Sequence, residues 1–308
     1  MKPPALVPFA LLALCVACEG GSPVQQATNA KADPSRRGTV AIAFEAKKQG
    51  VKPFPFPLVD GKVGGQATRF ILDTGASVHA IDTTVAAAAN ITSPGKASLI
   101  SIEGWGALPE HAVAVRELPK AIRAHGIGGI LSPQLLAEPG QSVVLDLINQ
   151  QLRMRPQSTA ASEMNDVGAV LTPPGQRKLC PADADGITGF AVAVDATVDG
   201  EATRLAIDTG ASRSILLEAS KSGARAAGHP LLGRSVAAGA SVDVATSIYG
   251  AVPFKVGAWS MPLDVGVSTP PRAAQCGAEG WLGMDVLHDC ALAMTADEAV
   301  VACRAPSR

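Results

Sequence analysis

Residues 63–77 read VGGQATRFILDTGAS, and residues 198–212 read VDGEATRLAIDTGAS. The two stretches align without a gap and are identical at ten of fifteen positions, including Ala-Thr-Arg and the whole of Asp-Thr-Gly-Ala-Ser. Their aspartates, Asp73 and Asp208, are 135 residues apart, a spacing far longer than the roughly 20–50 residues of a solenoid repeat. The duplication predicts two related lobes, each of which contributes one aspartate.

The residues before each aspartate predict a strand that runs into a loop. Gly64-Gly65 and Asp199-Gly200 are two-residue hairpin signals, because both pairs tolerate positive φ. After each turn, Ala-Thr-Arg and three apolar residues lead directly into Asp-Thr-Gly. We therefore expect each aspartate to lie where a core strand enters a loop.

Further features follow each aspartate in the same order. A glycine-bounded apolar step lies at residues 126–131 in the first half and at residues 280–287 in the second. Residues 143–147 and 291–294 then begin terminal hairpins. Aromatic residues make up only 4% of the chain, while Gly and Pro number 31 and 23, which favours short strands and tight turns.

This set of motifs resembles the aspartic proteases. The lobes are compact, so the chain is more similar to a retropepsin-like dimer fused into one chain than to the larger lobes of pepsin. The resemblance extends over residues 39–303, with its specific motifs confined to the two loops and the two glycine steps. It implies an all-β fold of two retropepsin-like, barrel-like lobes with short helices and an active site between the lobes.

Composition along the chain suggests where the parts begin and end. Residues 1–17 combine Lys2 with a short apolar run and are expected to be a signal peptide. Residues 18–37 have few large apolar side chains and are expected to be a flexible tether. The N-terminal lobe is predicted at residues 38–156, an interlobe connection at 157–185, and the C-terminal lobe at 186–304.

Two facing aspartates have a specific chemistry. Carboxylates about 3 Å apart cannot both ionise cheaply, so one keeps a proton while the other is charged. The charged one can deprotonate a water that attacks a peptide carbonyl, and its partner can protonate the carbonyl oxygen. The sequence therefore predicts an aspartic endopeptidase in which Asp73 and Asp208 are catalytic. The alternative is a catalytically silent peptide-binding or assembly lipoprotein on the same fold.

The resemblance also implies roles for the neighbours of the aspartates. Thr74 and Thr209 would each hydrogen-bond to the opposite loop, and Gly75 and Gly210 would permit close backbone approach. Both loops have Ala after Asp-Thr-Gly, as retroviral proteases do, where pepsin has Ser. Loss of a hydroxyl donor should raise the pKa values of the pair, which predicts activity that extends to mildly acidic or near-neutral pH.

Two aromatic-glycine pairs are candidate flap residues. They are Trp105-Gly106 in the first lobe and Tyr249-Gly250 in the second. Either pair could close over a bound peptide. The alternative is that these aromatics are buried or stack within hairpins.

Six cysteines divide into two groups. Cys15-Val16-Ala17-Cys18 resembles the lipobox of bacterial lipoproteins, which predicts lipidation of Cys18; plain secretion is the alternative. Four cysteines remain in the body, and an exported chain meets oxidising conditions, so two disulfides with three possible connectivities are expected. We predict Cys290 with Cys303, across a hairpin that turns near residues 296–298, and Cys180 with Cys276.

The remaining expectations concern partners. Neither paired Cys-x-x-Cys motifs nor metal-like His spacing occurs, so we expect no metal and no cofactor. The net charge of −1 gives no electrostatic reason to expect nucleic acid as a partner. The expected partner is a polypeptide in extended conformation. The protein is expected to be a monomer, exported and held by a lipid anchor to a bacterial membrane, facing the periplasm or the cell exterior.

Overall fold

The computed structural model describes residues 38–44, 56–92, 95–172, 176–184, 187–238, 243–269 and 275–305. All of them belong to one compact unit, Ala32–Arg308. The predicted signal peptide (1–17), the predicted tether (18–37) and Cys18 lie outside the described residues. The statements that follow concern the described part of the chain, which is mostly β.

The first half of the chain is built from short strands with few helices. Its elements are β1 (Val40–Ala41), β2 (Ala43–Phe44), β3 (Pro57–Val63), β4 (Gln66–Leu72), β5 (His79–Asp82), α1 (Thr83–Ala88), β6 (Gly95–Lys96), the 3-10 helix η2 (Ala97–Leu99), β7 (Ile100–Ile102), β8 (Gly106–Ala107), β9 (Ala112–Arg116), α2 (Lys120–Arg123), β10 (Ile127–Leu131), η3 (Pro133–Leu135), β11 (Gln141–Asp146), β12 (Gln151–Pro156), α3 (Gln157–Val167) and β13 (Ala169–Val170).

The second half has the same character, with longer strands. Its elements are β14 (Cys180–Ala184), β15 (Ile187–Ala191), β16 (Ala193–Val198), β17 (Glu201–Ile207), β18 (Ile215–Leu217), α4 (Lys221–Ala226), β19 (Leu231–Ala238), β20 (Asp243–Val256), β21 (Trp259–Ser268), η5 (Gln275–Gly277), β22 (Gly280–Leu282), α5 (Met284–Leu287), β23 (Cys290–Met294) and β24 (Ala299–Cys303).

Lobe 1, as we call the part built on the nine-stranded sheet, follows the order β6-β9-β5-β10-β4-β3-β7-β8, with β2 also paired to β3. The β3–β4 hairpin turns at Gly64 and Gly65, whose φ angles of 54° and 87° lie where glycine is favoured. Strand β10 runs parallel to β4 and antiparallel to β5. The strand before Asp73 is thus central in the sheet.

Lobe 2, built on the seven-stranded sheet, repeats this arrangement in the order β16-β17-β22-β18-β21-β20-β19. Strand β22 is parallel to β17 and antiparallel to β18, as β10 is to β4 and β5. Strand β18 is also parallel to β21, as β5 is to β9. The equivalence of the pairings confirms that the repeated sequence reflects a repeated fold.

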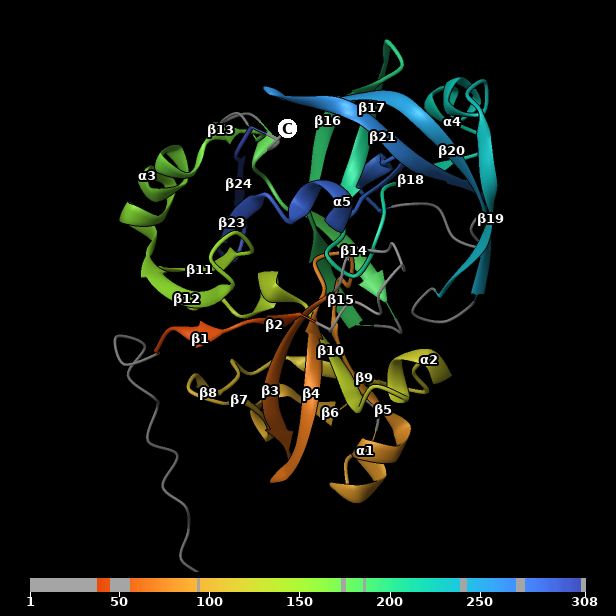
Figure 1. Ribbon diagram of the computed structural model, residues 1–308. Helices are drawn as coiled ribbons and strands as arrows, with labels where there is room; N and C mark the ends of the chain where they lie inside the picture. Colours follow the sequence, from red (N-terminus) through yellow and green to blue (C-terminus); the bar gives the residue numbers. More distant parts are fainter. Residues whose placement is uncertain are drawn as a thin grey trace, which may run out of the picture. The chain divides into compact units, whose positions relative to one another are not determined.

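A six-stranded sheet joins the two halves in the order β1-β12-β11-β23-β24-β13. The terminal hairpins β11–β12 and β23–β24 meet through the antiparallel pair of β11 with β23. The second hairpin turns between Met294 and Ala299, where the sequence predicted it. Helix α3 lies on this sheet (Figure 1) and packs Ala160 and Met164 against it.

The largest buried apolar cluster draws residues from both lobes and from the shared sheet. It includes Phe70 of lobe 1, Trp259 of lobe 2, and Leu145 and Leu292 from the central pair of strands. Burial of apolar surface is the main favourable term in folding, so the two lobes are stabilised together. No helix among the described residues is both long and apolar enough to cross a bilayer.

Candidate active site

Each Asp-Thr-Gly loop starts at the end of a central strand. Asp73 follows β4, and its backbone N–H donates to the carbonyl of Leu131 at the end of β10 (2.8 Å). Asp208 follows β17, and its N–H donates to the carbonyl of Leu282 at the end of β22 (2.9 Å). In each lobe, the strand that runs parallel to the loop-bearing strand (β10 or β22) therefore holds the first residue of the loop.

The two loops are joined by reciprocal hydrogen bonds of their threonines. The N–H of Thr74 donates to Oγ1 of Thr209 (3.0 Å), and the N–H of Thr209 donates to Oγ1 of Thr74 (3.1 Å). The Thr74 hydroxyl donates to the carbonyl of Ile207 (2.9 Å), and the Thr209 hydroxyl donates to that of Leu72 (2.6 Å). Both threonines are fully buried. The structure thus brings the two predicted loops into direct contact.

Glycine is required at the third position of each loop because the opposite carboxyl group lies against it. A Cβ on Gly75 would come within 2.4 Å of Cγ of Asp208, and a Cβ on Gly210 within 2.5 Å of Cγ of Asp73. Contacts below 3.0 Å are not seen for real Cβ atoms. Only a residue without a side chain lets the two carboxyl groups converge.

Backbone donors hold the two carboxyl groups. Oδ1 of Asp73 accepts from the N–H of Gly75 (2.8 Å) and of Ala76 (3.1 Å), and Oδ1 of Asp208 accepts from Gly210 (2.8 Å). Both aspartates remain partly exposed. A ligand or a water molecule can therefore reach them.

The pKa values of the two aspartates are perturbed in the same direction. Burial raises the pKa of Asp73, while the hydrogen bond from Asp208 and the backbone donors oppose that rise. Burial raises the pKa of Asp208 well above its ordinary value, and the charge of Asp73 raises it further. Both shifts favour a coupled pair that holds one proton between its two carboxyl groups, with the larger rise at Asp208.

Behind the loop of lobe 2 lies a buried carboxyl group that the sequence analysis missed. Oδ1 of Asp285 accepts from the N–H (2.9 Å) and the hydroxyl (2.7 Å) of Ser214, whose Oγ accepts from the N–H of Gly283 (3.0 Å). Burial raises the pKa of Asp285. Asp285 belongs to the predicted apolar glycine step, so an acidic residue inside that step was the available signal.

Behind the loop of lobe 1 lies a buried imidazole instead. His79 occupies the position of Ser214, six residues after the aspartate, and its Nδ1 accepts from the N–H of Ser132 (3.1 Å). Burial lowers the pKa of His79 to about 3, with a smaller contribution from His111. Gln134, which takes the position of Asp285, donates through Nε2 to backbone carbonyls of the loop. No single motif signalled these residues.

Of the candidate flap residues, Trp105 lies in the turn of the short β7–β8 hairpin, directly before Gly106. The Trp105 side chain is 3% exposed and belongs to the core, and Gly106 is in β8. Tyr249 and Gly250 lie within β20, and Tyr249 packs against the core. The turn of the long β19–β20 hairpin, residues 239–242, lies outside the described residues. Burial favours a structural role for Trp105, and the flap assignment stays a prediction.

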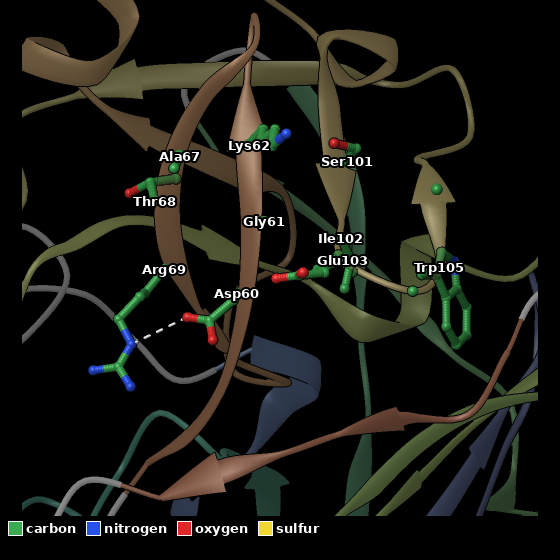
Figure 2. A pocket seen from close by; sticks show the side chains of 12 residues that line it. Asp60, Gly61, Lys62, Ala67, Thr68, Arg69, Ser101, Ile102, Glu103 and Trp105 are labelled. Atoms are coloured by element: carbon green, nitrogen blue, oxygen red, sulfur yellow. Dashed lines mark hydrogen bonds and ion pairs between the residues drawn. The ribbon is translucent and has the colours of Figure 1, made fainter.

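A hollow of about 770 Å³ lies on lobe 1 (Figure 2). It is formed by β3, β4, β7, β8 and the turn before β8, and an ion pair between Arg69 and Asp60 (3.3 Å) lies within it. None of its lining residues belongs to an Asp-Thr-Gly loop. The hollow is therefore separate from the aspartate pair.

The four body cysteines form the two predicted disulfides. Cys180–Cys276 links β14 to η5, with Cα atoms 5.7 Å apart, and Cys290–Cys303 links β23 to β24, with Cα atoms 4.0 Å apart. Because each of these sulfurs is in a disulfide, none of the four cysteines is free to bind zinc. Over the described ranges, no group of three or more His, Cys, Asp or Glu side chains could hold a metal ion.

The fold and the paired loops define a two-lobed, retropepsin-like acid-protease architecture. A family model described as aspartyl protease matches residues 59–119 and 194–286, which together make up half of the chain. Each matched segment includes one Asp-Thr-Gly loop. The chain belongs to the aspartyl protease family. A search of curated proteins found no match.

Proposed function

We propose that this protein is an exported aspartic endopeptidase that hydrolyses peptide bonds with a water molecule activated between Asp73 and Asp208. The observation that carries the proposal is the reciprocal hydrogen bonding of Thr74 and Thr209, which sets each carboxyl group against the glycine of the opposite loop. Family membership supports the same reaction class. Geometry and family together favour hydrolysis over a purely structural role.

The proposed reaction needs one proton shared by the pair. Asp73 takes a proton from the water as its oxygen attacks the carbonyl carbon, and Asp208 gives its proton to the carbonyl oxygen, which forms a diol. The proton on Asp73 then passes to the amide nitrogen, the C–N bond breaks, and a diol hydroxyl returns its proton to Asp208. The products are a carboxylic acid and an amine, and the pair regains its initial state without a covalent intermediate.

The pKa directions support the same division of roles. Activity needs Asp73 charged and Asp208 protonated, so it falls when the pH drops below the lower pKa of the pair or rises above the upper one. Both pKa values are raised above the ordinary aspartate value. We propose an optimum that extends into mildly acidic or near-neutral pH.

The proposed substrate is a polypeptide in extended conformation, bound between the lobes by strand-like pairing. One chain contributes both aspartates, which supports a monomeric enzyme. We retain the proposed lobes at residues 38–156 and 186–304 with a connection at 157–185. Nucleic acid is not proposed as a partner, because the net charge is close to zero.

The location is proposed from the cysteines and the first residues of the chain. The two disulfides are compatible with an exported protein. We propose that residues 1–17 act as a signal peptide and that Cys18 carries a lipid anchor, which would place the enzyme on the periplasmic or outer side of a bacterial membrane. Mass spectrometry of the mature N-terminus distinguishes a lipidated Cys18 from plain secretion.

A peptide-library digest at several pH values, run beside Asp73→Asn, tests the function. We expect cleavage by the wild type, sensitivity to a pepstatin-type inhibitor, and no cleavage by the variant. Peptide binding without cleavage at any pH would instead support the catalytically silent peptide-binding lipoprotein. A sharp optimum below about pH 3, under the ordinary aspartate pKa, would contradict the proposed pH range.

A further inference from the structure

The loop of lobe 2 is supported by a backbone hydrogen bond. The N–H of Met284 donates to the carbonyl of Ala211 (2.8 Å). Met284 is the second residue after Leu282, the residue whose carbonyl holds Asp208. The end of β22 and the start of α5 therefore hold both the first and the fourth residue of this loop.

Lobe 1 cannot form the equivalent bond. Leu131 holds Asp73 as Leu282 holds Asp208, so the residue that corresponds to Met284 is Pro133. Proline has no backbone N–H. The carbonyl of Ala76, which corresponds to that of Ala211, must therefore find another donor.

The neighbouring side chain provides that donor. Nε2 of Gln134 lies 2.9 Å from the carbonyl oxygen of Ala76, 3.2 Å from that of Thr74 and 2.8 Å from that of Phe190. Gln134 is only 1% exposed. The buried amide group of Gln134 thus donates to the carbonyls of the residues before and after Gly75.

The bond to Thr74 connects Gln134 to the catalytic carboxyl group. The carbonyl of Thr74 and the N–H of Gly75 belong to one planar peptide unit. The carbonyl end accepts from Gln134, and the N–H end donates to Oδ1 of Asp73 (2.8 Å). Holding one end of a rigid unit fixes the direction of the other.

We propose that Gln134 is a positioning residue for the catalytic loop of lobe 1, replacing the backbone donor that Pro133 lacks and orienting the N–H of Gly75 toward Asp73. The inference rests on the proposed function, because it gives Asp73 a catalytic role. Gln134 itself does not touch the reacting atoms.

The third bond extends this support to a separate element. Phe190 lies in β15, and its N–H donates to the carbonyl of Ser77 (3.2 Å). Gly189 is also packed on this carbonyl, since a Cβ there would come within 1.8 Å of it. Strand β15 pairs with β14, which the Cys180–Cys276 disulfide ties to η5. Gln134 therefore couples the loop of lobe 1 to a hairpin anchored by that disulfide.

The test compares Gln134→Met, which removes the donor and keeps a similar length, with the double variant Pro133→Ala/Gln134→Met, which restores a backbone N–H at residue 133. Gln66→Met, the same change at an exposed position, is the control. Near-UV circular dichroism verifies that each variant is folded. The readouts are kcat and KM as a function of pH, and the titration of Asp73 followed by carbon NMR of its carboxyl group.

We expect Gln134→Met to lower kcat roughly tenfold or more, since small displacements of catalytic groups are costly, with a smaller change in KM. A misdirected Gly75 N–H stabilises the carboxylate less, so the acid limb of the pH profile and the Asp73 titration should move to higher pH. The double variant should recover part of both effects. The control should match the wild type.

Two results would overturn the inference. One is an unchanged Asp73 titration and pH profile in folded Gln134→Met. The other is a double variant that recovers nothing although it is folded. If the wild type cleaves no peptide, the proposed endopeptidase function fails, while the NMR titration still decides whether Gln134 orients the loop.

Discussion

The two lobes present nearly identical Asp-Thr-Gly loops but support them with different buried groups. Lobe 1 has His79 behind the loop and uses Gln134 as a donor. Lobe 2 has Ser214 and Asp285 at the same positions and uses the N–H of Met284. The difference shows that the geometry of the aspartate pair is compatible with more than one supporting network.

The buried groups also give the lobes opposite responses to pH. Burial lowers the pKa of His79 to about 3, so the unfolded chain binds a proton that the folded chain does not, and lobe 1 loses stability as the pH falls from about 6.5 toward 3. Burial raises the pKa of Asp285, so its contribution is full at low pH and is lost as the pH rises through that raised pKa. At acidic pH the protein would therefore lose stability through protonation of His79 in lobe 1, whereas Asp285 in lobe 2 would cause no such loss.

The largest effect is expected at the aspartates themselves. Asp73→Asn and Asp208→Asn should each reduce kcat/KM by a factor on the order of 10² to 10⁴, and Asp73→Asn should be the more severe because it removes the base. Steady-state assays on the most rapidly cleaved peptide, with thermal unfolding as the check on folding, measure this. Full activity in both variants would refute the shared-proton mechanism.

The two loop glycines should be equally sensitive, which tests the symmetry of the pair. Gly75→Ala and Gly210→Ala each place a Cβ within 2.4–2.5 Å of the opposite carboxyl carbon and should lower kcat roughly 10²-fold. Gly233→Ala, at a glycine with open space around it, is the matched control. A strong effect in only one lobe would show that the two carboxyl groups are not held equivalently.

Replacing the buried imidazole should reduce the loss of stability of lobe 1 at acidic pH. His79→Gln keeps an acceptor for the Ser132 N–H but cannot titrate, so the free energy of unfolding should fall less steeply with pH than in the wild type. The difference should be about 1.4 kcal/mol per pH unit between about 6.5 and 3. Urea unfolding at pH 7, 6, 5 and 4 measures it.

His111 provides a comparison for this experiment, because burial also lowers its pKa while it remains partly exposed. His111→Gln should act in the same direction but more weakly. Parallel stability curves for the wild type and His79→Gln would show that His79 does not titrate on unfolding as proposed.

The smallest effect is expected when lobe 2 is made to resemble lobe 1. Met284→Pro removes the N–H that donates to Ala211, whereas Met284→Ala shortens the side chain and keeps that N–H. Proline suits the first residue of α5, since it follows an extended Gly283 (φ −97°, ψ −174°). Relative to Met284→Ala, we expect about 1 kcal/mol less stability and about fivefold lower kcat. If Met284→Pro and Met284→Ala had the same stability and kcat, this backbone hydrogen bond would be dispensable.

Much of the site could be predicted because its requirements are local. Asp, Thr and Gly are each needed for a property of the residue type, namely a carboxyl group, a hydroxyl that both donates and accepts, and room for an opposing group. Because the motif occurs twice, at residues 73–75 and 208–210, the prediction rested on two matching copies. The hairpin pairing of Cys290 with Cys303 was predictable for the same reason, since both cysteines flank one short turn.

The supporting residues could not be predicted because they depend on contacts between distant segments. Gln134 donates to carbonyls of a loop about 60 residues earlier, and its proposed role depends on Pro133, which has no backbone N–H, at the position of Met284. Trp105 was a candidate flap residue by its glycine neighbour, yet its side chain is buried in the core. Neither outcome is encoded in a short stretch of sequence.

The sequence by itself determined that there are two lobes, that each carries one catalytic-type loop, and that the lobes are all-β. Only the tertiary structure decided how each loop is held, how the terminal hairpins combine into one six-stranded sheet, and which buried group lies behind each aspartate. The physical reason is that residue type specifies what a side chain can donate, accept or accommodate, whereas packing specifies which partner it meets and how far each pKa moves.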